Sequence, residues 1–180
     1  LGRIRVDFNL SEQEKMVQRT AGEFAARSVQ PRAKDIDSSG EFPYDLIAET
    51  GRLGYRGLPY PERYGGSGAG YTSYVLMLEQ IGRASMVVAA ILHVNTVPEE
   101  AVFRFGSEEQ KAALLPPLAR GELLGGIAFT EAETGSDPRA LTTISRKNGD
   151  GYVITGQKQF VALAPALDRL LVFARHEGEG

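Results

Sequence analysis

One short run of residues has the types and spacing to do chemistry. Residues 127–137 begin as an apolar, β-prone stretch and end as the small polar sequence Thr134-Gly135-Ser136-Asp137. A strand that ends at Thr130 and opens into this turn presents hydroxyl and backbone N–H groups together at the edge of a sheet. Such a concave set of donors suits the oxygen atoms of a phosphate or a flavin. The run therefore predicts an anion- or cofactor-binding turn.

A plainer interpretation of the same turn competes with that one. Serine, threonine and aspartate side chains in loops commonly bond to their own backbone, which would leave little for a ligand. A second segment, residues 142–161, favours the binding interpretation, because its pattern is that of a hairpin that would reach the same surface. Its turn, Asn148-Gly149-Asp150-Gly151, contains glycines that tolerate the positive φ of a tight hairpin.

The elements before this run are predicted to be helices. Ser11 and Ser107 each stand three residues before a Glu or a Gln, and both pairs have the form of a capping box that starts a helix. Pro43 is placed to open another helix, because proline is tolerated in the first turn. Apolar residues recur at helical spacing over residues 71–81. Residues 86–97 are apolar on nearly every side, which is typical of the central helix of a bundle.

The character of the chain changes after Gly121. Four β-prone stretches follow, over residues 124–130, 141–147, 152–159 and 167–174. A run of helices followed by a run of strands is typical of an α+β arrangement. We therefore predict an N-terminal helical bundle over residues 1–121 and a partial antiparallel β domain over residues 122–180.

Composition excludes several classes of function. The 180 residues contain no cysteine and two histidines, so disulfides, thiolate-bound zinc and thiol catalysis are ruled out, and a metal site is not expected. A net charge of −3 without a cluster of basic residues argues against nucleic-acid binding. The longest uncharged stretch, residues 84–98, is shorter than the roughly 20 residues of a membrane span. With no signal-like N-terminal segment, the protein is predicted to be cytoplasmic.

Two further features are interpreted as structural. His93 lies within the apolar helix of residues 86–97, where a histidine of the core or of an interface is favoured over a catalytic one. Glu99 and Glu100 are adjacent, so on a helix their side chains point about 100° apart and cannot work as an acid–base pair. Both are therefore expected on a solvated face.

The turn and its surroundings resemble the flavin-binding segment of the acyl-CoA dehydrogenase family. The matching residues are, in order, Thr130-Glu131, Gly135-Ser136-Asp137, Gly156-Gln157-Lys158 and Phe160-Val161. Residues 54–70 and 105–122 resemble the stretches that precede this segment in the family. Short motifs of this kind are weak evidence one by one. Their common order and spacing make the whole chain similar to roughly the first half of such an enzyme.

The resemblance implies an FAD-binding oxidoreductase of fatty acid metabolism that desaturates an acyl-CoA thioester between its α and β carbons. It implies cofactor contacts from residues of both segments: Phe129, Thr130, Gly135, Ser136, Phe160, Val161 and Ala162. It also implies substrate contacts from Ser136, Val97, Pro98 and Ala101. The family's catalytic carboxylate is expected beyond Gly180, so this chain alone is expected to be inactive. An electron-transfer flavoprotein as electron acceptor and a homo- or hetero-oligomer are further implications.

Departures from the family pattern leave other activities open. Ala162 stands where the family usually has threonine, Leu163-Ala164-Pro165 replaces the usual Asn-Gly, and Ala132-Glu133 replaces Pro-Gly. The carboxylate of Glu133 would repel a pyrophosphate at close range. A flavin oxidase or monooxygenase of the same fold is therefore an alternative, as is a non-catalytic module that binds acyl-CoA or a partner chain.

Overall fold

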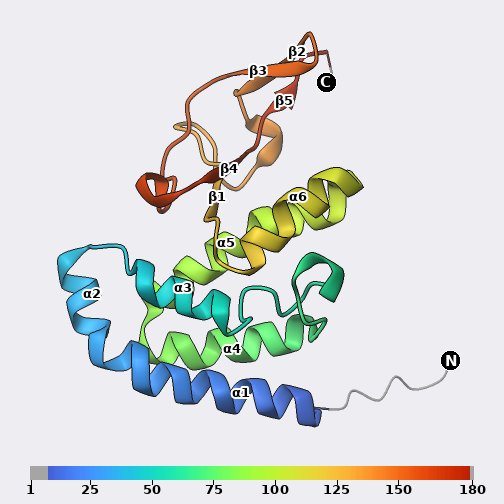
Figure 1. Ribbon diagram of the computed structural model, residues 1–180. Coiled ribbons are helices and arrows are strands. Elements are labelled where there is room, and N and C mark those ends of the chain that lie inside the picture. The colour runs from blue at the N-terminus through green and yellow to red at the C-terminus, as the bar shows by residue number, and fades with distance from the viewer. Residues whose placement is uncertain (1–7, 179–180) are drawn as a thin grey trace, which may run out of the picture.

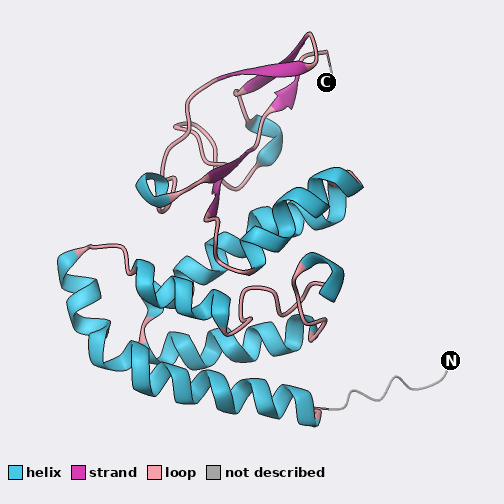
Figure 2. Ribbon diagram, in the orientation of Figure 1, coloured by secondary structure: helices cyan, strands magenta, loops and turns pink. Residues whose placement is uncertain are grey.

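The described α-helices all precede the strands along the chain, and Figure 2 shows the strands together in one part of the molecule with only short helical turns among them. The computed structural model describes residues 8–178, and the outer ends of the two predicted domains, residues 1–7 and 179–180, lie outside that range. The helices form the lower part of the molecule in Figure 1, and the strands form a smaller part above helices α5 and α6. The predicted α+β class is therefore confirmed.

Six α-helices make up the helical half of the described range. They are α1 (Glu12–Phe24), α2 (Ala33–Ser39), α3 (Tyr44–Arg52), α4 (Gly70–Ala84), α5 (Met86–Phe105) and α6 (Glu108–Ala119). Both predicted capping boxes are present, since Ser11 accepts a hydrogen bond from the N–H of Glu14 and Ser107 accepts one from the N–H of Gln110. Pro43 stands directly before α3 as its N-cap. Local signals in the sequence therefore set these three helix starts.

Helix α5 is the centre of the bundle. It packs against α4, α6 and strand β1 (Gly125–Ala128). Its buried face includes Val88, Ile91 and Leu92, which join one apolar core with residues of α1, α3 and α4. Its first residue, Met86, is 74% exposed, so the helix is not buried on every side as its composition indicates. By length and composition α5 alone among the described helices could cross a membrane, but its packing is that of a core helix.

The β half contains two small sheets in the described range. Strand β1 pairs with β4 (Arg169–Val172), while β2 (Ile144–Asn148) lies between β3 (Gly151–Thr155) and β5 (Arg175–His176). Strands β2 and β3 are antiparallel, and Gly149 turns between them at φ 60°, as the hairpin prediction requires.

The pairs β1–β4 and β2–β5 are parallel, so the prediction of an antiparallel domain is wrong for these two pairs. Parallel neighbours need a crossover of about a dozen residues or more, whereas a short turn can only produce an antiparallel pair. The whole stretch 129–168 separates β1 from β4, and it returns the chain to run beside β1 in the same direction. Sequence patterns show that a strand exists but not which earlier strand it joins.

One buried polar cluster joins the helical half to the first strand. The Oδ1 atom of Asn95, in α5, accepts hydrogen bonds from the N–H of Gly125 at 2.9 Å and from Nη2 of Arg56 at 3.2 Å. The same Nη2 donates to the carbonyl oxygen of Leu123 at 3.0 Å and lies 3.5 Å from Oε1 of Glu99. The cluster therefore fixes the point at which β1 leaves the bundle.

Glu99 is 1% exposed, so the prediction that it lies on a solvated face is wrong. Arg56 reaches it from the loop after α3, which the spacing of residues along α5 could not show. Burial raises the pKa of Glu99 to about 8, against the opposing attraction of Arg56. The folded protein therefore holds this proton more tightly than the unfolded chain does, since the ordinary pKa is 4.5.

Replacement of Asn95 by alanine is expected to destabilise the protein. It leaves the buried N–H of Gly125 without an acceptor, which costs about 1–3 kcal/mol, and it removes one of the three oxygen atoms that Nη2 of Arg56 reaches. Urea unfolding followed by circular dichroism measures the change. The matched control is His93→Gln on the exposed side of the same helix, which we expect to change the free energy of unfolding by less than about 0.5 kcal/mol. Equal stability of the two variants would contradict this role of Asn95.

The raised pKa of Glu99 predicts a pH dependence of stability. Between the unfolded pKa of 4.5 and the folded value of about 8, the folded state binds more protons than the unfolded state. The contribution of Glu99 is therefore complete below the lower value and is lost as pH rises through the upper one. Urea unfolding at about pH 5.5, 7 and 8.5 should show Glu99→Gln gaining stability relative to the natural chain as pH rises. A constant difference would show that Glu99 does not titrate in this window.

Candidate functional site

The turn after β1 is closed by its own backbone. The N–H of Glu131 donates to the carbonyl oxygen of Thr134 at 2.8 Å, and the reverse bond is 3.4 Å long. The hydroxyl of Thr134 donates to the carbonyl oxygen of Asp137 at 2.8 Å. The carboxylate of Asp137 accepts in turn from the N–H of Arg139 at 3.1 Å. The plainer interpretation therefore holds for Thr134, because the backbone occupies its hydroxyl.

Thr130 and Ser136 differ from Thr134. Within residues 8–178 neither hydroxyl makes a hydrogen bond, and neither do the N–H groups of Gly135 and Ser136. Thr130 is half-buried and Ser136 is exposed. The turn therefore presents donors that its own fold does not use.

The second predicted segment lies against this turn. The N–H of Gln159 donates to the carbonyl oxygen of Thr130 at 2.9 Å, and its side-chain Nε2 donates to that of Glu131, also at 2.9 Å. Phe160 follows with a left-handed backbone, at φ 56°, and its side chain is 86% exposed. A bulky residue rarely adopts positive φ, and here the conformation leaves an aromatic ring in solvent next to the tied turn.

The two residues after Phe160 differ in exposure. Val161 is half-buried and borders a small cavity of about 160 Å³ together with Leu167 and Leu170. Ala162 is exposed and has no hydroxyl to offer a ligand. Glu133, the other departure from the family pattern, is exposed as well.

An ion pair that the sequence did not reveal joins the two segments. Nζ of Lys158 lies 2.8 Å from Oε1 of Glu131 and donates to the carbonyl oxygen of Phe129 at 2.9 Å, with the Lys158 and Glu131 side chains 9% and 4% exposed. Oε2 of Glu131 accepts from the N–H and the hydroxyl of Thr142, both at 2.6 Å. Oε1 accepts from the N–H of Thr143 at 2.9 Å.

These bonds decide the protonation of Glu131. Burial by itself would raise the pKa of the carboxyl group, but the hydrogen bonds from Lys158, Thr142 and Thr143 outweigh it and hold the pKa well below its ordinary value. Glu131 is therefore ionised at neutral pH. Both charged residues stand inside the matched motifs, yet they are 27 positions apart and carry no local signal of pairing.

The residues predicted to contact substrate lie on α5, apart from Ser136 in the turn. Pro98 is buried and packs against β1, where a Cβ added to Gly125 would lie 2.7 Å from its ring. Val97 and Ala101 are half-buried and share one side of the helix, because residues four apart lie on one face. His93 is exposed, with Nδ1 3.5 Å from the hydroxyl of Tyr74. Of the two places predicted for it, the core is therefore wrong, and an interface stays a prediction.

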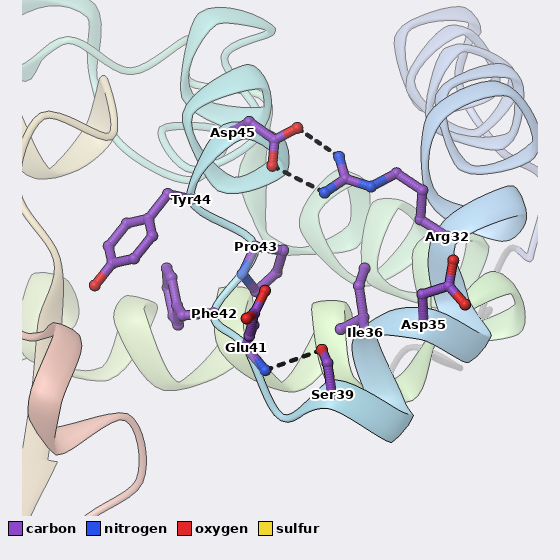
Figure 3. A pocket seen from close by; sticks show the side chains of 9 residues that line it. All are labelled: Arg32, Asp35, Ile36, Ser39, Glu41, Phe42, Pro43, Tyr44 and Asp45. Atoms are coloured by element: carbon purple, nitrogen blue, oxygen red, sulfur yellow. Dashed lines mark hydrogen bonds and ion pairs between the residues drawn. The ribbon is translucent and has the colours of Figure 1, made fainter.

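A cavity of about 490 Å³ lies away from this turn, and Figure 3 shows the side chains around it. Arg32 on its wall already forms two hydrogen bonds with the carboxylate of Asp45, at 2.5 and 3.1 Å. Asp35 and Glu41 add further negative charge. Its volume is within the range of roughly 300–1,000 Å³ of ligand sites. With its cation paired and its other charges negative, however, it does not suit a phosphate-bearing ligand, and we do not place the functional site there.

Comparison with known proteins shows the family of the chain. The model of the acyl-CoA dehydrogenase N-terminal domain matches residues 11–122, and that of the acyl-CoA dehydrogenase middle domain matches residues 126–180. The chain belongs to the acyl-CoA dehydrogenase family. Four motifs of the sequence thus indicated the family correctly.

Individual relatives agree with this family. An acyl-CoA dehydrogenase of Bacillus subtilis is 37% identical over 167 residues, which are 92% of this chain and 44% of that protein. A solved structure of the electron transferring flavoprotein of Acidaminococcus fermentans matches with a TM-score of 0.90 and 33% identity, over 94% of this chain and 45% of that one. An acyl-CoA dehydrogenase complexed with FAD from Bacillus anthracis matches with a TM-score of 0.87 and 33% identity, over 97% and 31%. The chain spans less than half the length of these relatives.

The unused hydroxyls of the turn predict an unusual tolerance to substitution. Thr130→Ala and Ser136→Ala should each change the free energy of unfolding of this chain by less than about 0.5 kcal/mol, because no internal hydrogen bond is lost. Thr134→Ala is the matched control in the same turn and should cost about 0.5–1.5 kcal/mol, because it removes the bond to Asp137. Urea unfolding followed by tyrosine fluorescence compares the three. A cost at Thr130 or Ser136 equal to that at Thr134 would show that their hydroxyls serve the fold.

Proposed function

We propose that this chain forms the helical part and the first β part of an FAD-dependent acyl-CoA dehydrogenase, with its two domains over residues 1–121 and 122–180. Such an enzyme desaturates an acyl-CoA thioester between its α and β carbons. One observation carries the proposal: the turn with the unused hydroxyls of Thr130 and Ser136 is tied through Gln159 to the exposed ring of Phe160, in a chain of this family.

The residues present fit FAD. The polar edge of a flavin needs neutral donors, and the hydroxyl of Thr130 and the N–H of Gly135 have no competing partner in the described range. The flat ring needs apolar neighbours, which Phe129, Phe160 and Val161 supply in the two joined segments. Ser136, at the exposed end of the turn, is proposed to contact the ribityl-phosphate side of FAD or the acyl-CoA.

This chain's own residues are proposed to bind, to orient and to exclude water. FAD, when bound, supplies the hydride acceptor of the reaction. Thr130 is proposed to hold the pyrimidine edge of the ring, while Phe160 and Val161 keep water from one face and Ala162 adds no hydroxyl to it. Glu131 is not the proton acceptor, because its carboxylate is buried, fully engaged and of lowered pKa. The catalytic carboxylate is therefore proposed to come from another part of a longer protein.

The remaining contacts are proposals of the same kind. Val97 and Ala101 are half-buried, and their exposed surface is proposed to contact an acyl chain. Pro98 packs against β1 beside them. We propose an electron-transfer flavoprotein as electron acceptor, an oligomeric enzyme and a cytoplasmic location.

One observation favours a second candidate function. Ala162 is exposed and offers no hydroxyl where the family usually has one, so a flavin bound here would lack that donor. An oxidase of the same fold would release hydrogen peroxide when its reduced flavin meets oxygen. The experiment adds an acyl-CoA to the FAD-bound protein without oxygen and then admits oxygen. Reduction of the FAD in the first step and no release of peroxide in the second would support the dehydrogenase.

In the longer protein that contains this segment, Thr130→Ala and Ser136→Ala should each weaken FAD binding by about 1–3 kcal/mol, because a buried acceptor on the cofactor loses its donor. This corresponds to about 5- to 150-fold in Kd. Titration of FAD into the apo-protein, followed by quenching of flavin fluorescence, measures the change.

The controls for this titration lie in the same chain. Glu133→Gly should leave FAD affinity equal or better, because it removes a carboxylate from beside the turn. His93→Gln should have little effect, since that residue lies on α5. If the Thr130 and Ser136 variants bind FAD like the natural protein while His93→Gln does not, the cofactor does not lie on this turn.

A further inference from the structure

We infer that Glu131 and Lys158 are positioning residues, which hold the two flavin-facing segments in register for the cofactor. The inference rests on the proposed function and adds two residues to which the resemblance gave no role. Neither side chain is offered to a ligand, because both are almost fully buried. Their effect on the cofactor would pass through the residues beside them in each segment.

The two segments are joined mainly through side chains. Strand β1 ends at Ala128 and strand β3 ends at Thr155, so the cofactor residues of both segments lie outside the regular sheets. The N–H of Gln159 makes a backbone bond between them, to the carbonyl oxygen of Thr130. Lys158 adds bonds to Phe129 and Glu131, and the side chain of Gln159 adds another to the carbonyl oxygen of Glu131.

Glu131 also ties the turn to a third stretch of chain. Its carboxylate accepts from the N–H groups of Thr142 and Thr143, which lie just before β2. Gly156, just after β3, packs so closely on Thr143 that a Cβ there would lie 2.3 Å from Oγ1 of the threonine. The carboxylate is thus the common acceptor for Lys158 and for the entry to β2, and its loss would remove one of the two acceptors of Lys158 and the acceptor of the N–H groups of Thr142 and Thr143.

The opposite charges of Glu131 and Lys158 distinguish an ion pair from simple packing in a mutational test. A buried carboxylate whose cation is removed, or a buried ammonium whose carboxylate is removed, is left with an uncompensated charge. Removal of both charges together leaves neither. We therefore expect each single neutral variant to hold the two segments together less firmly, and to bind FAD more weakly, than the double variant. A role of the two side chains in packing alone would not produce this order.

The first part of the test uses this chain without cofactor. In Glu131→Gln and in Lys158→Met, hydrogen exchange at the N–H groups of Gln159 and Thr143 should accelerate by about tenfold or more, while exchange in α5 stays unchanged. Arg139→Met is the matched control, because it removes an ion pair of the same turn whose side chains are 91% and 54% exposed. Unchanged exchange at Gln159 and Thr143 in both single variants would overturn the inference, whatever binds to the protein.

The second part uses the longer protein and FAD. Each single variant should raise the Kd for FAD by about tenfold or more and alter the visible circular dichroism of the bound flavin, and the double variant Glu131→Gln/Lys158→Met should recover part of the loss. Arg139→Met should bind FAD like the natural protein. Single variants that bind FAD as tightly as the natural protein, with the same visible spectrum, would overturn the positioning role. A natural protein that binds no FAD would instead contradict the proposed function, and the exchange experiment would still decide whether the pair holds the segments together.

Discussion

The amide of Asn95 is the contact on which the arrangement of the two halves depends. It lies at the centre of the bundle, on the buried side of α5, and its oxygen accepts from both the first residue of β1 and the guanidinium of Arg56. Because a buried backbone N–H is costly to leave unpaired, the strand has a single favourable place to leave the bundle. The position of the turn after β1 follows from that place.

Buried pairs of an acidic and a basic residue occur at two places in the described part of this chain. Near the bundle, Arg56 and Glu99 are enclosed so completely that burial raises the pKa of the glutamate. In the β half, Glu131 is as deeply enclosed, but Lys158 and two threonines bond to it and lower its pKa. The difference lies in the number of donors that reach each carboxylate, since hydrogen bonds to the charged form favour ionisation. The carboxylate of Glu131 is therefore held in its charged form, and its ion pair with Lys158 joins the two segments proposed to hold FAD.

The β half is open on its outer side. Strand β3 is exposed along its length, with Tyr152, Val153 and Ile154 from 47% to 66% exposed, and Phe160 is exposed further along. A small sheet with apolar side chains on exposed faces gains little from burial by itself. Phe160 belongs to the proposed cofactor surface, and its contribution to binding would depend on what packs against it in a longer protein.

The sequence by itself determined the family, the starts of α1, α3 and α6, and the existence of most strands. Ser11, Ser107 and Asn148–Gly151 act through bonds and backbone preferences within a few residues, so their effects can be predicted from neighbours alone. It also placed the polar turn after β1. What it could not show was that the hydroxyl of Thr134 faces its own backbone while those of Thr130 and Ser136 do not.

Only the tertiary structure decided the pairing of β1 with β4, the burial of Glu99 and the bond between Glu131 and Lys158. Each of these joins residues far apart in the chain. A glutamate has the same local pattern whether water or an arginine from another loop lies beside it. The physical reason is that burial and charge pairing depend on which surfaces meet in space, and no spacing within one element encodes that.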